Sequence, residues 1–109
     1  MSGSVQFSTA ILLFVLLLTG AEPAAGPLTA EEYYLSGKAK YHLKDYTGAI
    51  EDYNRAAELA PDVAKIFGSR GAAKRKLGDK QGAIEDAKQA ARLGDRQAQR
   101  ILRFFGYDW

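Results

Sequence analysis

The chain has 109 residues, with 15 Lys and Arg against 13 Asp and Glu, and it contains no Cys. This length accommodates one small domain, and the absence of Cys excludes disulfide bonds and a lipid anchor of the bacterial lipoprotein type. The single His42 has no second His and no Cys to accompany it, so a metal site or a catalytic dyad of these residues is not expected.

The N-terminus is apolar and uncharged. Residues 2–21 contain no charged side chain, and residues 10–18 form an uninterrupted apolar run. Small residues at the end of this stretch suit signal-peptidase cleavage after Ala21, although the stretch is also nearly long enough to span a bilayer. We predict that residues 1–21 are the signal peptide of an exported protein, which would be periplasmic, luminal or secreted. The alternative is a membrane anchor over residues 5–21.

Five helices are predicted after a linker over residues 22–29, which is rich in turn-forming residues and has no periodicity. Each helix begins at or just after a residue that can cap its first amide groups, namely Thr29, which forms a capping box with Glu32, and then Asp45, Asp62, Asp79 and Asp95. The later helices end at residues that break the hydrogen-bond ladder or favour a left-handed turn, namely Pro61, Gly78, Gly94 and Gly106. The predicted helices cover residues 30–43, 46–59, 63–77, 79–93 and 96–105. Their short connections predict antiparallel hairpins.

A repeat with a period of 34 residues runs through these helices. Residues 45–59 and 79–93 are identical at 9 of 15 positions without a gap, and the same offset pairs Gly37 with Gly71. A repeat of this length in a helical pattern is typical of a stacked solenoid. The repeat therefore indicates binding rather than catalysis.

The repeated positions resemble the tetratricopeptide repeat family, whose units carry large residues, small residues and a proline at set places. The first unit, residues 30–63, supplies all of them, namely Tyr33, Gly37, Ala49, Tyr53, Ala56 and Pro61. The second unit, residues 64–97, supplies Phe67, Gly71, Ala83 and Ala90, and departs from the pattern at Ala87 and Asp95. Residues 90–102 also look like the related Sel1-like repeats. The resemblance implies an all-α fold of two tandem helix-turn-helix hairpins, followed by a C-terminal capping helix and aromatic tail over residues 98–109.

Two charged pairs recur at one internal spacing, Lys40 with Asp52 and Lys74 with Asp86. The short turn inside each hairpin brings the members of each pair together. We interpret them as ion pairs within each repeat, because a partly buried charge needs a partner. The alternative is that these residues contact a ligand.

In the resembled family, the first helix of each hairpin lines a concave groove that holds a partner. Carried over position by position, the resemblance implies partner-binding roles for Tyr34, Lys38, Tyr41, His42, Lys65, Ser69, Arg75 and Lys76. The carboxylate clamp of chaperone-binding relatives is not in place, because Tyr34, Lys38 and Ser69 occupy its positions. Binding of a chaperone tail is therefore not expected.

Charge is divided unevenly between the two units. Residues 30–63 have a net charge of −3, and residues 64–97 have a net charge of +5. The basic residues either form an ordinary solvated face or attract an acidic peptide segment of another protein. Nucleic acid is not an expected partner, because the basic third helix offers only Phe67, at a core position, to stack on bases. A membrane is expected as a partner only through an uncleaved N-terminal segment.

The leading hypothesis is a non-enzymatic protein–protein interaction module or scaffold, with no catalytic residue, cofactor or metal site. The alternative is structural self-assembly into a homo-oligomer, because two repeats are fewer than the roughly three usually needed for stability. The aromatic tail, residues 104–109, is expected to fold back over the open end of the last hairpin. An exposed hook for a partner is the alternative for the tail.

Overall fold

The computed structural model describes residues 27–109. The predicted signal peptide or anchor and most of the predicted linker lie outside the described residues, so both stay predictions. Within residues 27–109 the chain forms five α-helices and no strand, namely α2 (Ala30–His42), α3 (Tyr46–Leu59), α4 (Ala64–Lys76), α5 (Lys80–Arg92) and α6 (Arg96–Phe104). This confirms the all-α prediction. None of these five helices is both long enough and apolar enough to cross a bilayer.

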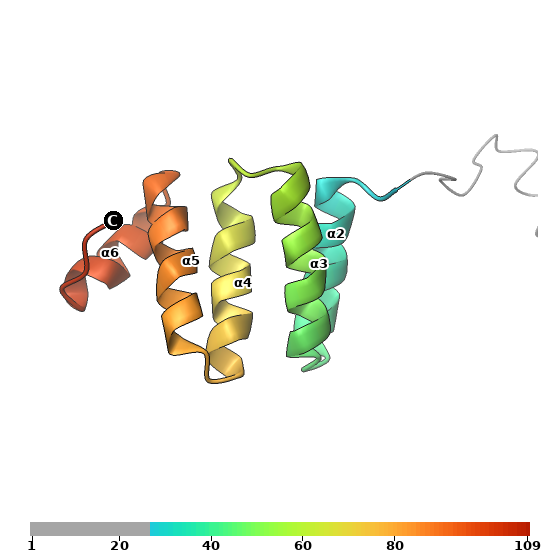
Figure 1. Cartoon of the computed structure of the whole chain (residues 1–109), viewed down its shortest axis with the longest axis horizontal. Coiled ribbons are helices and arrows are strands. Elements are labelled where there is room, and N and C mark those ends of the chain that lie inside the picture. The colour runs from blue at the N-terminus through green and yellow to red at the C-terminus, as the bar shows by residue number, and fades with distance from the viewer. Residues whose placement is uncertain (1–26) are drawn as a thin grey trace, which may run out of the picture.

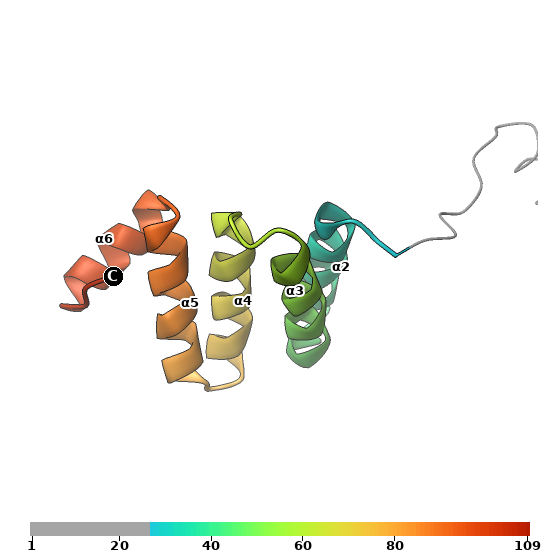
Figure 2. The ribbon, with the colours of Figure 1, turned by 45° about the horizontal axis from the view of Figure 1, so that its top comes forward.

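Consecutive helices pack as two hairpins. Helix α2 packs along α3, α4 packs along α5, and α3 joins the two hairpins by contacting α4. Figure 1 shows α3, α4 and α5 side by side with α2 behind α3, and α6 follows at the far end of the row. The turned view in Figure 2 keeps this order and shows α6 tilted away from the axes of the hairpin helices.

Local chemistry explains where most helices begin. Asp45 accepts a hydrogen bond from the Gly48 amide at 3.0 Å, and Asp79 does the same for Gly82 at 2.9 Å. Such contacts satisfy amide groups that have no partner inside the helix. Thr29 and Asp95 cap α2 and α6 in the same way.

The predicted cap of the third helix is wrong. The cap residue of α4 is Val63, which makes no side-chain cap hydrogen bond, whereas Asp62 lies in the turn that follows Pro61. Val63 is half-buried and packs against the core. The burial of this apolar side chain places it at the helix start, so that Asp62 falls one residue too early to cap.

Small residues let the two helices of each hairpin approach closely. A Cβ added to Gly37 would lie 2.6 Å from Cε1 of the buried Tyr53, closer than atoms can pack. A Cβ added to Gly71 would lie 3.1 Å from Cβ of Asp86 and 3.3 Å from the Ala83 carbonyl oxygen. The glycines of both repeats therefore mark the positions where the helices of each hairpin cross.

Helix α6 covers the second hairpin with one face only. Its buried residues are Ala98 and Leu102, which join the core, and the helix that it packs against is α5. Phe104 and Phe105 are 83% and 67% exposed. The expectation that the whole aromatic tail covers the open end is therefore wrong for these two residues, because Leu102 already fills the contact with α5.

Candidate partner-binding site

A hollow lies between the first helices of the two hairpins. It has a volume of about 200 Å³, and its lining residues are Lys38, Tyr41 and His42 from α2, Tyr53 from α3, and Ser69 and Ala72 from α4. Four of the eight residues predicted to bind a partner are among them. The volume is below the roughly 300–1,000 Å³ that is usual for a small-molecule site. The hollow is therefore suited to a side chain of a peptide more than to a whole small ligand.

Helical spacing brings these side chains to one face. Tyr41 and His42 come three and four residues after Lys38 on α2, so both lie on the same side of the helix as Lys38. On α4, Arg75 and Lys76 come three and four residues after Ala72. Both are exposed in the last turn of α4 and extend the same face beyond the hollow.

Aromatic rings form much of this surface. Tyr41 is half-buried and meets His42 edge-on, with ring centroids 5.9 Å apart, and it meets Tyr46 in the same way at 5.3 Å. Burial raises the pKa of Tyr53 to about 12, and the neighbouring Tyr34 adds to the rise. Tyr53 lines the hollow, and its protonated hydroxyl can both donate and accept a hydrogen bond there.

Tyr34 lies beneath this surface. Its side chain is buried, its ring centroid lies 5.8 Å from that of Tyr53, and its hydroxyl accepts a hydrogen bond from Ser69 at 3.4 Å. The amino groups of Lys65 and Lys38 lie 4.6 and 5.8 Å from the Tyr34 ring centroid. Tyr34 therefore holds other members of the predicted set in place and exposes little surface of its own.

Lys65 already has a partner within the chain. Its amino group lies 2.9 Å from Oε2 of Glu31, a residue at the equivalent position of the first repeat. Lys38, Arg75 and Lys76 make no ion pair among residues 27–109. The positive charge available at the site therefore rests on these three residues more than on Lys65.

The two recurring charged pairs are ion pairs inside the hairpins, as predicted. Lys40 lies 3.0 Å from Asp52, and Lys74 lies 3.0 Å from Asp86. The hydrogen bond to Asp52 raises the pKa of Lys40 above its ordinary value. Since their charges are used within the fold, these four residues do not belong to the candidate site.

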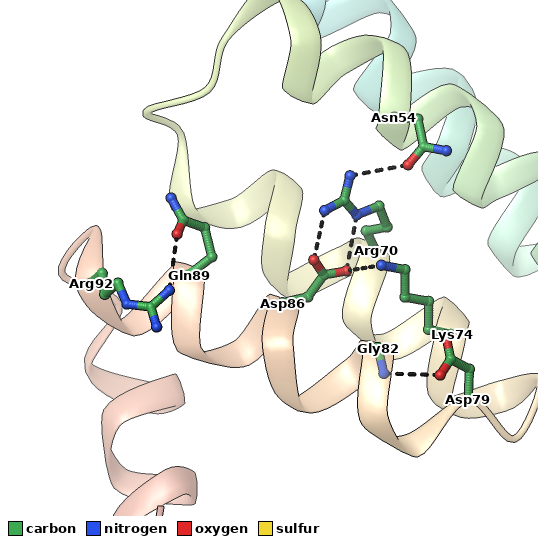
Figure 3. Close-up of polar contacts among 8 residues, drawn as sticks. All are labelled: Asn54, Arg70, Lys74, Asp79, Gly82, Asp86, Gln89 and Arg92. Carbon is green, nitrogen blue, oxygen red and sulfur yellow. Dashed lines mark hydrogen bonds and ion pairs between the residues drawn. The ribbon is translucent and has the colours of Figure 1, made fainter. Parts of the chain in front are cut away.

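Sequence reasoning missed the part that Arg70 plays in this network. Figure 3 shows its guanidinium group between Asp86 on α5 and Asn54 on α3, so that it links the two hairpins. The hydrogen bond from Nη1 to the Asn54 Oδ1 is 3.0 Å long. The repeat offers a signal that could have found it, because Arg70 follows Ser36 by 34 residues, and Ser36 donates a hydrogen bond to Asp52.

Among residues 27–109, no group of three or more His, Cys, Asp or Glu side chains is placed to hold a metal ion. The predictions of no metal, no cofactor and no catalytic residue stay predictions.

Comparison with known proteins bears on the first hairpin. Residues 30–63 match the family model described as a tetratricopeptide repeat. These bounds are those predicted for the first unit. No curated protein matches the chain.

Proposed function

We propose that this chain is a non-enzymatic module that holds an acidic peptide segment of another protein between α2 and α4. Residues 30–63 match the tetratricopeptide repeat, and such repeats are generally protein–protein interaction modules. The observation that carries the proposal is the hollow, where Lys38, Tyr41 and His42 face Ser69 and Ala72.

The chemistry of the hollow and its margin favours an acidic segment. Tyr41 supplies amphipathic contact area of the kind that often dominates binding energy at interfaces. Lys38, Arg75 and Lys76 add positive charge that no acid among residues 27–109 pairs. Exposed charges of this kind raise the association rate with a partner of opposite charge and disfavour partners of like charge. Added salt screens these charges and weakens the attraction.

A binding measurement with two synthetic peptides tests this function. The probes are a fluorescent peptide of Glu and Leu residues and the same peptide with Gln in place of Glu. We expect the whole protein to bind the Glu peptide more tightly, with an affinity that falls as salt is added. Equal affinity for the two peptides would contradict the electrostatic part of the proposal.

A matched pair of variants assigns the binding to the groove. Lys38→Glu with Arg75→Glu reverses two charges at the groove, and we expect affinity for the Glu peptide to fall about tenfold or more. Lys80→Glu with Arg92→Glu makes the same change of charge on α5, which does not line the hollow. Equal losses in both double variants would show that net charge, and not the groove, attracts the peptide.

Head-to-tail self-association is a second candidate function, favoured by a second hollow. This one has a volume of about 640 Å³ on the first hairpin and is lined by Tyr33, Glu51, Asp52, Asn54, Arg55 and Glu58. Glu51 and Glu58 give this lining acidic groups that complement the basic second hairpin of another copy. Sizing the protein over a range of concentrations separates the candidates, because only self-association predicts growth with concentration.

A further inference from the structure

The outer face of α6 and the residues after it form an exposed aromatic surface. We define the α6 surface by its apolar members, Ile101, Phe104, Phe105, Tyr107 and Trp109, which are between 36% and 83% exposed. Phe104 and Phe105 contact each other edge-on, with ring centroids 5.1 Å apart. Because α6 uses Ala98 and Leu102 to pack on α5, this second apolar face remains open to solvent.

A stripe of positive charge runs beside these apolar side chains. Arg96, Arg100 and Arg103 are spaced four and three residues apart, so they share one side of α6, and all three are exposed. Residues 96–109 contain one acid, Asp108. Lys88 and Arg103 also lie over the rings of Tyr107 and Trp109, at 5.7 and 5.2 Å from the centroids.

We propose that the α6 surface binds an anionic lipid surface. A helix with exposed aromatic side chains along one side and Arg along the next can lie in the plane of a membrane interface, with the rings among the acyl chains. Trp and Tyr prefer the interface itself because they combine an apolar ring with a polar group. Each Arg near an anionic surface adds attraction that salt weakens.

The charge pattern selects this occupant over another protein. An apolar groove on a protein could cover the aromatic side chains, but it would also need acidic residues at three matching positions to pair with Arg96, Arg100 and Arg103. The headgroups of an anionic membrane supply negative charge across the whole surface, so no such match is needed. Helix α6, which carries this surface, lies at the opposite end of the helix row from α2, as Figures 1 and 2 show. The proposal is therefore independent of the groove and of the peptide it holds.

Fluorescence of Trp109 tests the proposal in the whole chain. Trp109 is the single Trp of the protein, so its emission reports the α6 surface and not binding through the apolar N-terminal residues. We expect phosphatidylglycerol vesicles to shift the emission to shorter wavelength and to protect Trp109 from acrylamide, and added salt to weaken both effects. Phosphatidylcholine vesicles should produce a smaller change.

Two double variants separate the apolar and the charged contributions. Phe104→Ser with Phe105→Ser should lower partitioning onto phosphatidylglycerol vesicles by more than about tenfold, since two exposed rings no longer enter the lipid. Arg96→Gln with Arg100→Gln should weaken binding to these vesicles but not to phosphatidylcholine. Arg75→Gln with Lys76→Gln removes the same charge from α4 and should leave the Trp109 response unchanged.

Three results would overturn the proposal. The first is an unchanged Trp109 spectrum with phosphatidylglycerol vesicles. The second is a Trp109 response to these vesicles that is as large in the double variant of Phe104 and Phe105 as in the unchanged protein, while the variant keeps its helical circular dichroism. The third is a blue shift without vesicles that grows with protein concentration, which would identify a second copy of the chain as the occupant.

Discussion

Arg70 donates two hydrogen bonds to Asp86 across the second hairpin, from Nε to Oδ2 at 2.9 Å and from Nη2 to Oδ1 at 2.6 Å. Lys74 adds an ion pair to the same carboxylate, and the residue Asp86 is 3% exposed. In the first hairpin, Asp52 accepts one hydrogen bond from Ser36 at 2.6 Å and pairs with Lys40. The equivalent positions 36 and 70 therefore carry a neutral donor, Ser36, in the first hairpin and a charged donor, Arg70, in the second.

Asp86→Ala should destabilise the fold more than Asp52→Ala. Removing Asp86 leaves two partly buried cations without their partner, and we expect a loss of about 3 kcal/mol, at the low end for a broken buried pair because both cations keep some contact with water. Asp52→Ala should cost less, since Lys40 is more exposed than Lys74. Urea denaturation of both variants checks this, and equal losses would contradict it.

Gly37→Ala should destabilise the first hairpin although Ala favours helices. The added methyl group would meet the ring of Tyr53, which is fully packed and cannot move aside. We expect a loss of about 1–3 kcal/mol. Gly68→Ala is the control, because a Cβ there would meet only the carboxylate of Asp95, at 3.9 Å, and should stabilise α4 by about 0.5–1 kcal/mol. Thermal melting of both variants measures these changes. A change of melting temperature in the same direction for both would contradict the prediction.

Lys44→Gly should stabilise the protein. Lys44 has a φ of 64°, in the left-handed region that glycine adopts without a steric penalty, and Gly78 occupies the equivalent place in the second repeat with a φ of 84°. Relief of this strain outweighs the greater freedom of Gly in the unfolded chain, and we expect a net gain of up to about 1 kcal/mol. The reverse change, Gly78→Lys, should lower the melting temperature. A destabilised Lys44→Gly protein would refute this explanation.

Tyr53 should make the fold sensitive to alkali. Its folded pKa of about 12 exceeds the ordinary value of 10.0, so the folded state retains a proton that the unfolded state releases. The associated stability is complete below pH 10 and is lost as pH rises from 10 to 12, by about 2–3 kcal/mol. Lys40, whose pKa is also raised, acts in the same direction.

Tyr53→Phe should flatten this part of the pH profile relative to the unchanged protein. Equilibrium unfolding measured between neutral pH and pH 12 compares the two. An unchanged slope in the Tyr53→Phe protein would show that another group carries the alkaline sensitivity.

The sequence alone determined where most helices begin and which residues could share a face. A cap such as Asp45 or Asp79 acts on an amide three residues away, so its effect can be judged from neighbours along the chain. The spacing of Lys38, Tyr41 and His42 likewise predicted one side of α2, and the structure brings them to one hollow. The pairs of Lys40 with Asp52 and of Lys74 with Asp86 were predictable because a Lys and an Asp recur at the same spacing in both repeats.

Only the tertiary structure decided which of these side chains remain available. Tyr34 is buried, and Lys65 pairs with Glu31, because the first helices of the two hairpins pack at a distance that the 34-residue period does not encode. The same holds for Arg70, which reaches Asn54 on another hairpin. Phe104 and Phe105 stay exposed because α6 meets α5 through Ala98 and Leu102, and the angle of that contact depends on how two surfaces fit together.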